Sequence, residues 1–147
     1  MLRNWQSHSD YQQHLIQRLS AYNQKEKSRL ILLDKAISKL YLYLLNLDNL
    51  LPIIKPLYPN FGRPAINQQG IIRSLTLMLD QHEYSITKWA KTVQQDDLFF
   101  DICGFDSNKA PGVGSYYDLL WRFWLAMAKN LLRIVCVPIA PMAKSFI

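Results

Sequence analysis

The chain has 147 residues, which is enough for one domain with a buried core. Half of the residues are hydrophobic and 19% are charged, and this composition excludes an intrinsically disordered chain. Seventeen basic residues against 11 acidic residues give a formal net charge of +6, which favours polyanionic partners without identifying one.

The cysteines and the termini indicate the compartment. Cys103 and Cys136 stand in apolar surroundings without a Cys or His at metal-ligand spacing, which predicts buried, reduced thiols. The polar N-terminus shows no secretion signal. The apolar segment 119–143 is interrupted by three basic residues and two prolines, so it lacks the uninterrupted apolar span of about 18 residues that a transmembrane helix needs. These features predict a soluble, cytoplasmic protein without a membrane partner.

Two helices are predicted in residues 1–51. The first begins near Ser9 and Asp10 and carries apolar residues at helical spacing. The second begins near Ser28 and carries a heptad-like seam in steps of three and four: Leu30, Leu33, Ile37, Leu40, Leu44, Leu47 and Leu51. Further apolar residues broaden the seam, which favours a long core helix over a dimeric coiled coil. Residues 1–51 are therefore expected to form an N-terminal helical segment.

Pro52 is expected to end this helix, and the prolines that follow predict a connector over residues 52–64. Residues 65–132 then show helical patterns that each begin at a capping residue: Asn67, Ser85, Asp96 and Ser115. Gly104 is expected to stop the third of these helices. Pro138 and Pro141 predict an irregular tail over residues 133–147.

No alternating strand pattern is present, so the predicted fold class is all-α. The expected architecture is a compact multi-helix domain with a long N-terminal helical segment and a helix-turn-helix-like centre. Arg73 is expected on the outer side of its helix. The final helix is apolar on both sides and is expected to be covered on both. Trp121 and Trp124 are expected in the core, where truncation to alanine costs about 3 to 5 kcal/mol.

No catalytic arrangement is visible in the sequence. Asp96, Asp97 and Asp101 lie close together, but the first two suit a helix cap and the third an exposed turn. The histidines lack a cysteine or carboxylate at ligand spacing, and no phosphate-binding glycine loop is present. The chain is therefore predicted not to be an enzyme, with no catalytic residue, no metal ligand and no cofactor.

A set of basic and polar residues suits contact with DNA phosphates: Arg63, Lys88, Lys91, Ser115, Tyr116 and Arg122. Ser115 and Tyr116 are predicted at a helix N-terminus, where backbone N–H groups and the positive end of the helix favour phosphate. The alternative is a solvated basic surface beside aromatic core residues, and residue spacing alone does not separate the two interpretations.

Several of these residues belong to a longer pattern. It runs through Gly62-Arg63-Pro64, a helix with Arg73, Ser85 to Trp89, Cys103-Gly104-Phe105, Pro111, and Ser115-Tyr116-Tyr117 through Arg122. In order and spacing this pattern resembles the N-terminal region of bacterial insertion-sequence transposases of the DDE type. The resemblance covers residues 52–124.

The resemblance implies a helical module that helps to bind double-stranded DNA at the ends of a mobile element. In that family a ribonuclease-H-like domain with acidic residues and metal ions follows this module. No strand-rich domain follows Trp124 in this sequence, so the resemblance implies a truncated or frameshifted element that cannot perform strand transfer alone. Two alternatives stay open. One is a helical interaction protein, acting as a homo-oligomer or as a partner of full-length transposase, and the other is a decayed reading frame.

Overall fold

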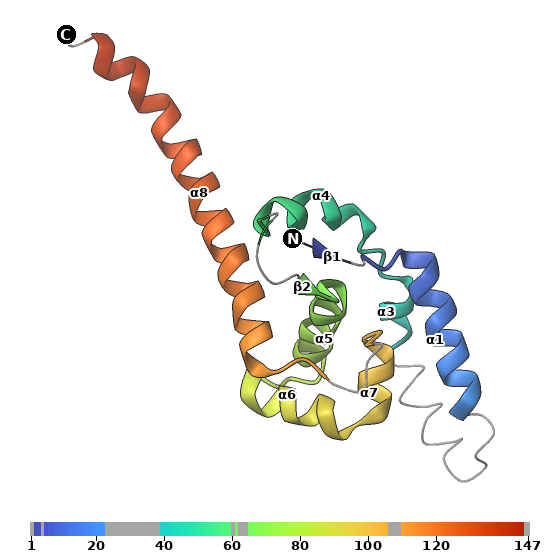
Figure 1. The fold of residues 1–147 in the computed structure, drawn as a ribbon. Coiled ribbons are helices and arrows are strands. Elements are labelled where there is room, and N and C mark those ends of the chain that lie inside the picture. The colour runs from blue at the N-terminus through green and yellow to red at the C-terminus, as the bar shows by residue number, and fades with distance from the viewer. Residues whose placement is uncertain are drawn as a thin grey trace.

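Helix α5 (Gln68–Asp80) lies in the middle of the fold, with other helices around it (Figure 1). The computed structural model describes residues 2–3, 5–22, 39–59, 61, 65–105 and 110–145, with side chains described as far as Arg133. The other helices in these ranges are α1 (His8–Tyr22), α3 (Leu40–Leu44), α4 (Leu51–Ile54), α6 (Ile86–Gln95), α7 (Asp97–Ile102) and α8 (Val113–Ser145). The predicted all-α fold class is thereby confirmed.

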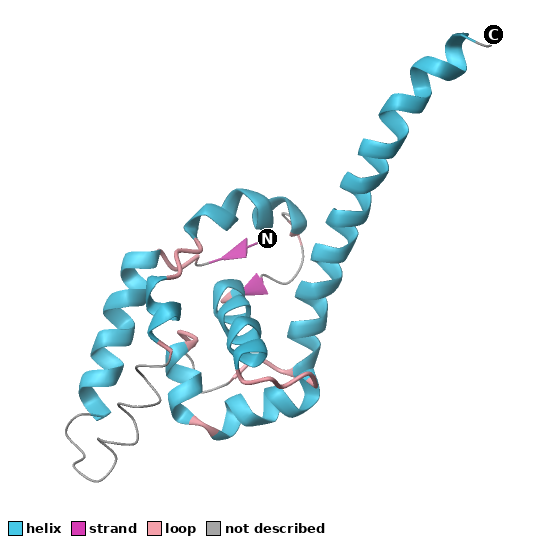
Figure 2. Cartoon of the chain, turned by 180° about the vertical axis from the view of Figure 1, so that it is seen from behind, coloured by secondary structure: helices cyan, strands magenta, loops and turns pink. Residues whose placement is uncertain are grey.

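A short parallel strand pair supplements the helices. Strand β1 (Leu2–Arg3) pairs with β2 (Ala65–Ile66), with Leu2 opposite Ala65 and Arg3 opposite Ile66. Sequence periodicity did not predict this pair, because two residues are too few to show the alternation of a strand. The pair holds the N-terminal end of the chain beside the segment that enters α5 (Figures 1 and 2).

The long second helix predicted up to Leu51 is wrong in the part that the structure describes, and the seam residues before Lys39 lie outside the described ranges. Helix α3 ends at Leu44, Leu45 is extended, and a 3-10 helix, η2 (Asp48–Leu50), follows. Asp48 explains the break. Its carboxylate accepts hydrogen bonds from the backbone N–H of His8, at 3.1 and 3.2 Å, and from the indole N–H of Trp5 at 3.2 Å. These tertiary bonds override the heptad periodicity.

Pro52 does not end a helix, because it lies at the start of one. It occupies the first turn of α4, where a proline costs no hydrogen bond since that N–H has no helical partner. A second 3-10 helix, η3 (Lys55–Leu57), follows directly. The first half of the predicted connector 52–64 is therefore helical, and residues 62–64 lie outside the described ranges.

The core gathers apolar side chains from several helices: Tyr11, Leu15, Leu42, Ile54, Tyr58, Ile71, Leu77, Met78, Trp89, Ala90, Val93, Leu98, Phe99, Ile102, Cys103, Phe105, Tyr116 and Leu119. Cys103 is buried and free, as predicted, whereas the Cys136 side chain lies outside the described side chains. Asp101, expected in an exposed turn, is 4% exposed within α7 and pairs with Arg18 at 3.8 Å.

The capping signals are confirmed at two helices. The Ser85 hydroxyl accepts from the backbone N–H of Lys88 and starts α6, and the Asp96 carboxylate accepts from the N–H groups of Leu98 and Phe99 and starts α7. Asn67 precedes α5 but makes no side-chain cap. Its backbone is left-handed, with φ of 61°, and its amide donates to the carbonyl of Gly104 instead.

Gly104 stops α7 as predicted. Its φ is +80°, its N–H bonds to the carbonyl of Asp101, and the N–H of Phe105 bonds to the carbonyl of Phe100. This pair of hydrogen bonds defines a Schellman motif. The rings of Phe100 and Phe105 lie 5.5 Å apart and supply the apolar contact that usually accompanies the motif.

Helix α8 departs most from expectation. It begins at Val113, so Ser115 lies inside its first turn rather than before it, and the backbone stays helical to Ser145 where an irregular tail was predicted. Each internal proline removes one intrahelical hydrogen bond, which is why Pro138 and Pro141 predicted a break, but extending an existing helix costs less than starting one and the backbone continues through both. Trp121 and Trp124 are 60% and 64% exposed, so the prediction that they lie in the core is wrong.

Candidate nucleic-acid interface

Two of the predicted DNA-contacting residues share the outer face of α6. Lys88 and Lys91 are exposed and stand one turn apart, so their side chains project from the same side of the helix. Trp89, Ala90 and Val93 face the other way and are buried in the core. This strong amphipathicity fixes the rotation of α6 and holds both ammonium groups in solvent.

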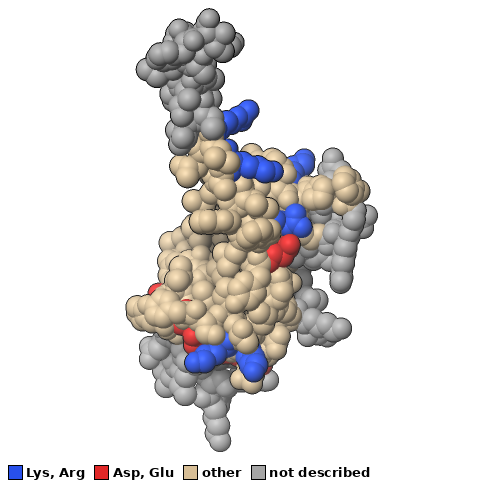
Figure 3. All heavy atoms as spheres, turned by 90° about the vertical axis from the view of Figure 1, so that its left-hand side faces the viewer, with Lys and Arg blue, Asp and Glu red and all other residues tan. Residues whose placement is uncertain are grey.

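Ser115 is a third predicted contact that is exposed, in the first turn of α8. Helices α6 and α8 pack against each other, so Ser115 comes from an element that touches the one carrying the two lysines. Figure 3 views the α8 side of the molecule and shows basic side chains at its lower end and along α8, with acidic side chains next to both groups and a broad uncharged surface between them. Arg63 lies outside the described residues.

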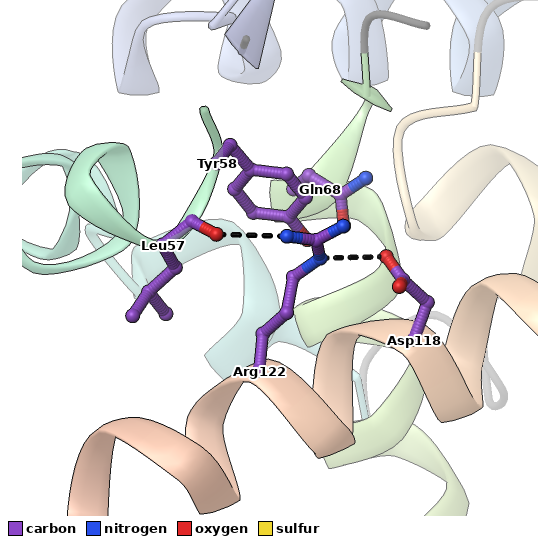
Figure 4. Close-up of polar contacts among 5 residues, drawn as sticks. All are labelled: Leu57, Tyr58, Gln68, Asp118 and Arg122. Atoms are coloured by element: carbon purple, nitrogen blue, oxygen red, sulfur yellow. Dashed lines mark hydrogen bonds and ion pairs between the residues drawn. The ribbon is translucent and has the colours of Figure 1, made fainter. Parts of the chain in front are cut away.

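Arg122 was predicted to contact DNA, but in the structure its guanidinium joins α8 to the rest of the helix cluster, here called the body (Figure 4). Its Nε donates to the carboxylate of Asp118 at 2.9 Å, and one terminal N–H group donates to the carbonyl of Leu57 at 2.8 Å. The guanidinium carbon lies 4.4 Å from the centre of the Tyr58 ring, whose hydroxyl donates to Gln68. Two N–H donors of Arg122 thus serve the fold, and its side chain is half-buried, so the freely exposed DNA contact predicted for Arg122 is corrected.

Tyr116 is also corrected, because it is fully buried rather than presented to a ligand. Its hydroxyl lies 2.8 Å from the hydroxyl of Ser74, which also accepts a hydrogen bond from the indole N–H of Trp89 at 2.9 Å. This polar cluster of Ser74, Trp89 and Tyr116 joins α5, α6 and α8. The sequence signal for it was the aromatic pair at the start of α8, which does not reveal which of Tyr116 and Tyr117 faces inward.

Arg73 is the residue whose environment sequence reasoning missed most. It is 1% exposed rather than outward, and its guanidinium carbon lies 3.5 Å from the centre of the Tyr11 ring. Burial lowers the pKa of Arg73, and its Nε and one terminal nitrogen have no hydrogen-bond partner among the described residues. Stacking on an aromatic ring is how a weakly hydrated guanidinium is accommodated in a core. No pattern in the residues near Arg73 predicts that the ring of Tyr11, from a distant segment, lies against its guanidinium.

Alkaline pH is expected to destabilise this fold. Burial raises the pKa of Tyr58, Tyr116 and Cys103 to about 12 each. In the unfolded chain the tyrosines ionise near pH ~10 and the cysteine near ~8.5, so the stabilisation is complete below these values and is lost as pH rises toward the folded pKa. From about pH 10 to 12 for each tyrosine, and from about pH 8.5 to 12 for the cysteine, ionisation lowers the free energy of unfolding by up to ~1.4 kcal/mol per pH unit and group.

Urea unfolding followed by circular dichroism at a series of pH values measures this loss. Tyr116→Phe removes one of the titrating groups and is expected to make the alkaline decline less steep. A free energy of unfolding that is unchanged across the range would contradict the burial of these groups.

Other kinds of site have little support in the described residues. They contain no group of three His, Cys, Asp or Glu side chains arranged to hold a metal ion. None of the described helices combines the length and the apolar character needed to cross a bilayer. A scan of protein-family models and searches of curated proteins and solved structures found no match to this chain.

Proposed function

We propose that this chain is a DNA-binding helical module of the transposase type, which contacts the phosphate backbone of duplex DNA through the outer face of α6. The finer expectation, that the duplex is the end of a mobile element, comes from the sequence resemblance and belongs to the same proposal. Several described residues of the resemblance, namely Arg73, Trp89, Gly104, Tyr116 and Arg122, join helices of the fold, and this convergence supports treating that part of the pattern as one structural unit.

The convergence involves three joints. Trp89 and Tyr116 share the hydroxyl of Ser74 and so join α5, α6 and α8. Gly104 lets the end of α7 approach Arg73 and the ring of Tyr11. Arg122 then ties α8 to η3 and to its own Asp118. The pattern residues thus build a frame, and the frame holds α6 with its lysines outward.

The observation that carries the proposal is that Lys88 and Lys91 stand together on the exposed face of α6 without a described carboxylate partner. Three of the other described cations have carboxylate partners within 4 Å: Arg18 with Asp101, Lys39 with Asp80, and Arg122 with Asp118. The exposed Lys55, Lys129 and Arg133 have none in the described part of the chain. The two lysines of α6 have no such carboxylate in the described part of the chain. Their ammonium groups are therefore free to displace the counterions of a phosphate backbone.

Fluorescence anisotropy with a labelled duplex tests the proposal. We expect affinity to fall linearly with salt on a log–log plot, and the double variant Lys88→Gln/Lys91→Gln to reduce that slope by about 2, one unit for each lysine. Affinity near physiological salt is expected to fall about tenfold.

Lys55→Gln is the matched control, because it removes one exposed lysine from η3, away from α6. If Lys55→Gln weakens binding as much as Lys91→Gln alone, net charge rather than the α6 face drives binding. Absence of binding to any duplex at low salt rejects the proposal.

A further inference from the structure

Helix α8 carries a large apolar face that the rest of the molecule leaves uncovered. Its first turns pack on the body through Tyr116, Leu119 and Phe123. Beyond Phe123 no described α8 side chain belongs to the core, and the helix projects away from the helix cluster (Figures 1 and 2). The projecting part therefore meets solvent on all the sides that the structure describes.

The exposed apolar residues recur in steps of one to four and form one continuous stripe: Tyr117, Leu120, Trp121, Trp124, Leu125, Met127, Leu131 and Leu132. Ala128 fills the remaining position of the stripe. The exposed basic residues Lys129 and Arg133 lie outside the stripe, on the side of the helix that also carries the half-buried Arg122. The stripe itself contains no charged residue.

The size of the stripe exceeds what an isolated molecule normally exposes. Its eight large side chains are 39% to 65% exposed and together present on the order of 1,000 Å² of surface. The largest apolar patch on a typical monomer is about 300–600 Å², whereas each partner in a standard specific interface buries about 800 Å². The stripe therefore has the area that one side of a stable dimer needs.

We infer that this face binds the same face of a second copy of the chain, with the two α8 helices antiparallel. The stripe is self-complementary in this arrangement. A two-fold axis that crosses the helix pair at the level of residue 126 places Trp124 against Ala128 of the partner subunit. The same axis places Trp121 against Leu131 of the partner subunit, so each large ring meets a smaller side chain.

The distribution of charge on α8 also favours a second copy of the chain as the partner. In this pairing the cations of both helices lie away from the contact, so two like-charged chains do not repel each other across it. The uncharged stripe offers no carboxylate or ammonium group to select an unlike partner. Two antiparallel copies would also place their bodies at opposite ends of the paired helices.

Sedimentation equilibrium of the intact chain, from submicromolar to high micromolar concentration, tests the inference. We expect a reversible monomer–dimer equilibrium that high salt does not weaken. The fluorescence of the exposed Trp121 and Trp124 should shift to shorter wavelength as dimer forms. A strict monomer over the whole range overturns the inference.

Two variants separate specific pairing from general stickiness. Trp124→Glu is expected to weaken dimerisation at least about 30-fold, as loss of a central aromatic contact does. Ala128→Trp is also expected to weaken it, because the added ring collides with Trp124 of the partner subunit. If Ala128→Trp instead tightens association, contact between the helices is unspecific and the antiparallel pairing is wrong.

Lys129→Glu, outside the stripe on α8, is the matched control and should leave the dimer constant within about threefold. Circular dichroism melting of each variant in the monomeric concentration range verifies the fold, since all three positions are outside the core. An equal loss of dimer in Lys129→Glu and Trp124→Glu would overturn the assignment of the stripe as the interface.

Discussion

Replacing Trp89 by alanine is expected to lower the free energy of unfolding by about 3 to 5 kcal/mol. The side chain is 2% exposed, and its ring lies 5.6 Å from that of Phe99, at the junction of α6 and α7. Truncation leaves a cavity that the surrounding helices cannot fill. It also removes the indole N–H group that donates a hydrogen bond to the hydroxyl of Ser74. Urea unfolding followed by circular dichroism measures the change.

Trp124→Ala is the matched control, because it removes the same side chain from a position that is 64% exposed. Its effect on the monomer is expected to stay within about 0.5 kcal/mol when unfolding is measured at submicromolar concentration. Comparable losses at the two positions would mean that the face of α8 bearing Trp124 packs on the body, contrary to the structure.

Local signals in the sequence predicted the centre of the fold well. Ser85 and Asp96 begin helices because a side-chain oxygen satisfies N–H groups two or three residues later, and Gly104 ends one because its φ is positive. The inner stripe of α6 also follows from periodicity alone. These features need only a few neighbouring residues, so a single sequence contains the information that determines them.

Contacts between distant segments were beyond such signals. The heptad seam predicted one helix up to Leu51, but the Asp48 carboxylate accepts hydrogen bonds from His8 and Trp5 in a distant segment. These bonds place Asp48 at the start of a separate 3-10 helix. Arg73 looked like a surface residue because its helix gives no sign of the Tyr11 ring above it. The charge of Arg122 likewise led to its prediction as a DNA contact. In the structure its N–H groups donate to the carbonyl of Leu57 and the carboxylate of Asp118 instead.

The orientation of α8 shows a further limit. A helix that is apolar on both sides indicates that both sides are covered in the functional state, but not by what. In the structure one side meets the body through Leu119 and Phe123, whereas the side with Trp121 and Trp124 stays open. The structure thus divides α8 into a first part that packs on the helix cluster and an exposed apolar face, for which we propose self-association.

Gly104→Ala is expected to destabilise the protein by about 2 to 5 kcal/mol, from two separate costs. The first is backbone strain, since alanine disfavours the φ of +80° by roughly 1–2 kcal/mol. The second is a collision, because the added Cβ would lie 2.9 Å from the ring of Tyr11. That ring cannot move aside freely, since its hydroxyl donates to the carbonyl of Ile102 at 2.6 Å and its face carries Arg73.

Gly114→Ala provides the opposite expectation in the same chain. Gly114 lies in the first turn of α8, where nothing stands within 4 Å of the added Cβ, so alanine should raise stability by up to about 1 kcal/mol. Thermal and urea unfolding of both variants measure the difference. A Gly104→Ala protein as stable as wild type would mean that the end of α7 does not adopt the Schellman motif. The Tyr11–Arg73 stack would then not lie against the backbone at this position.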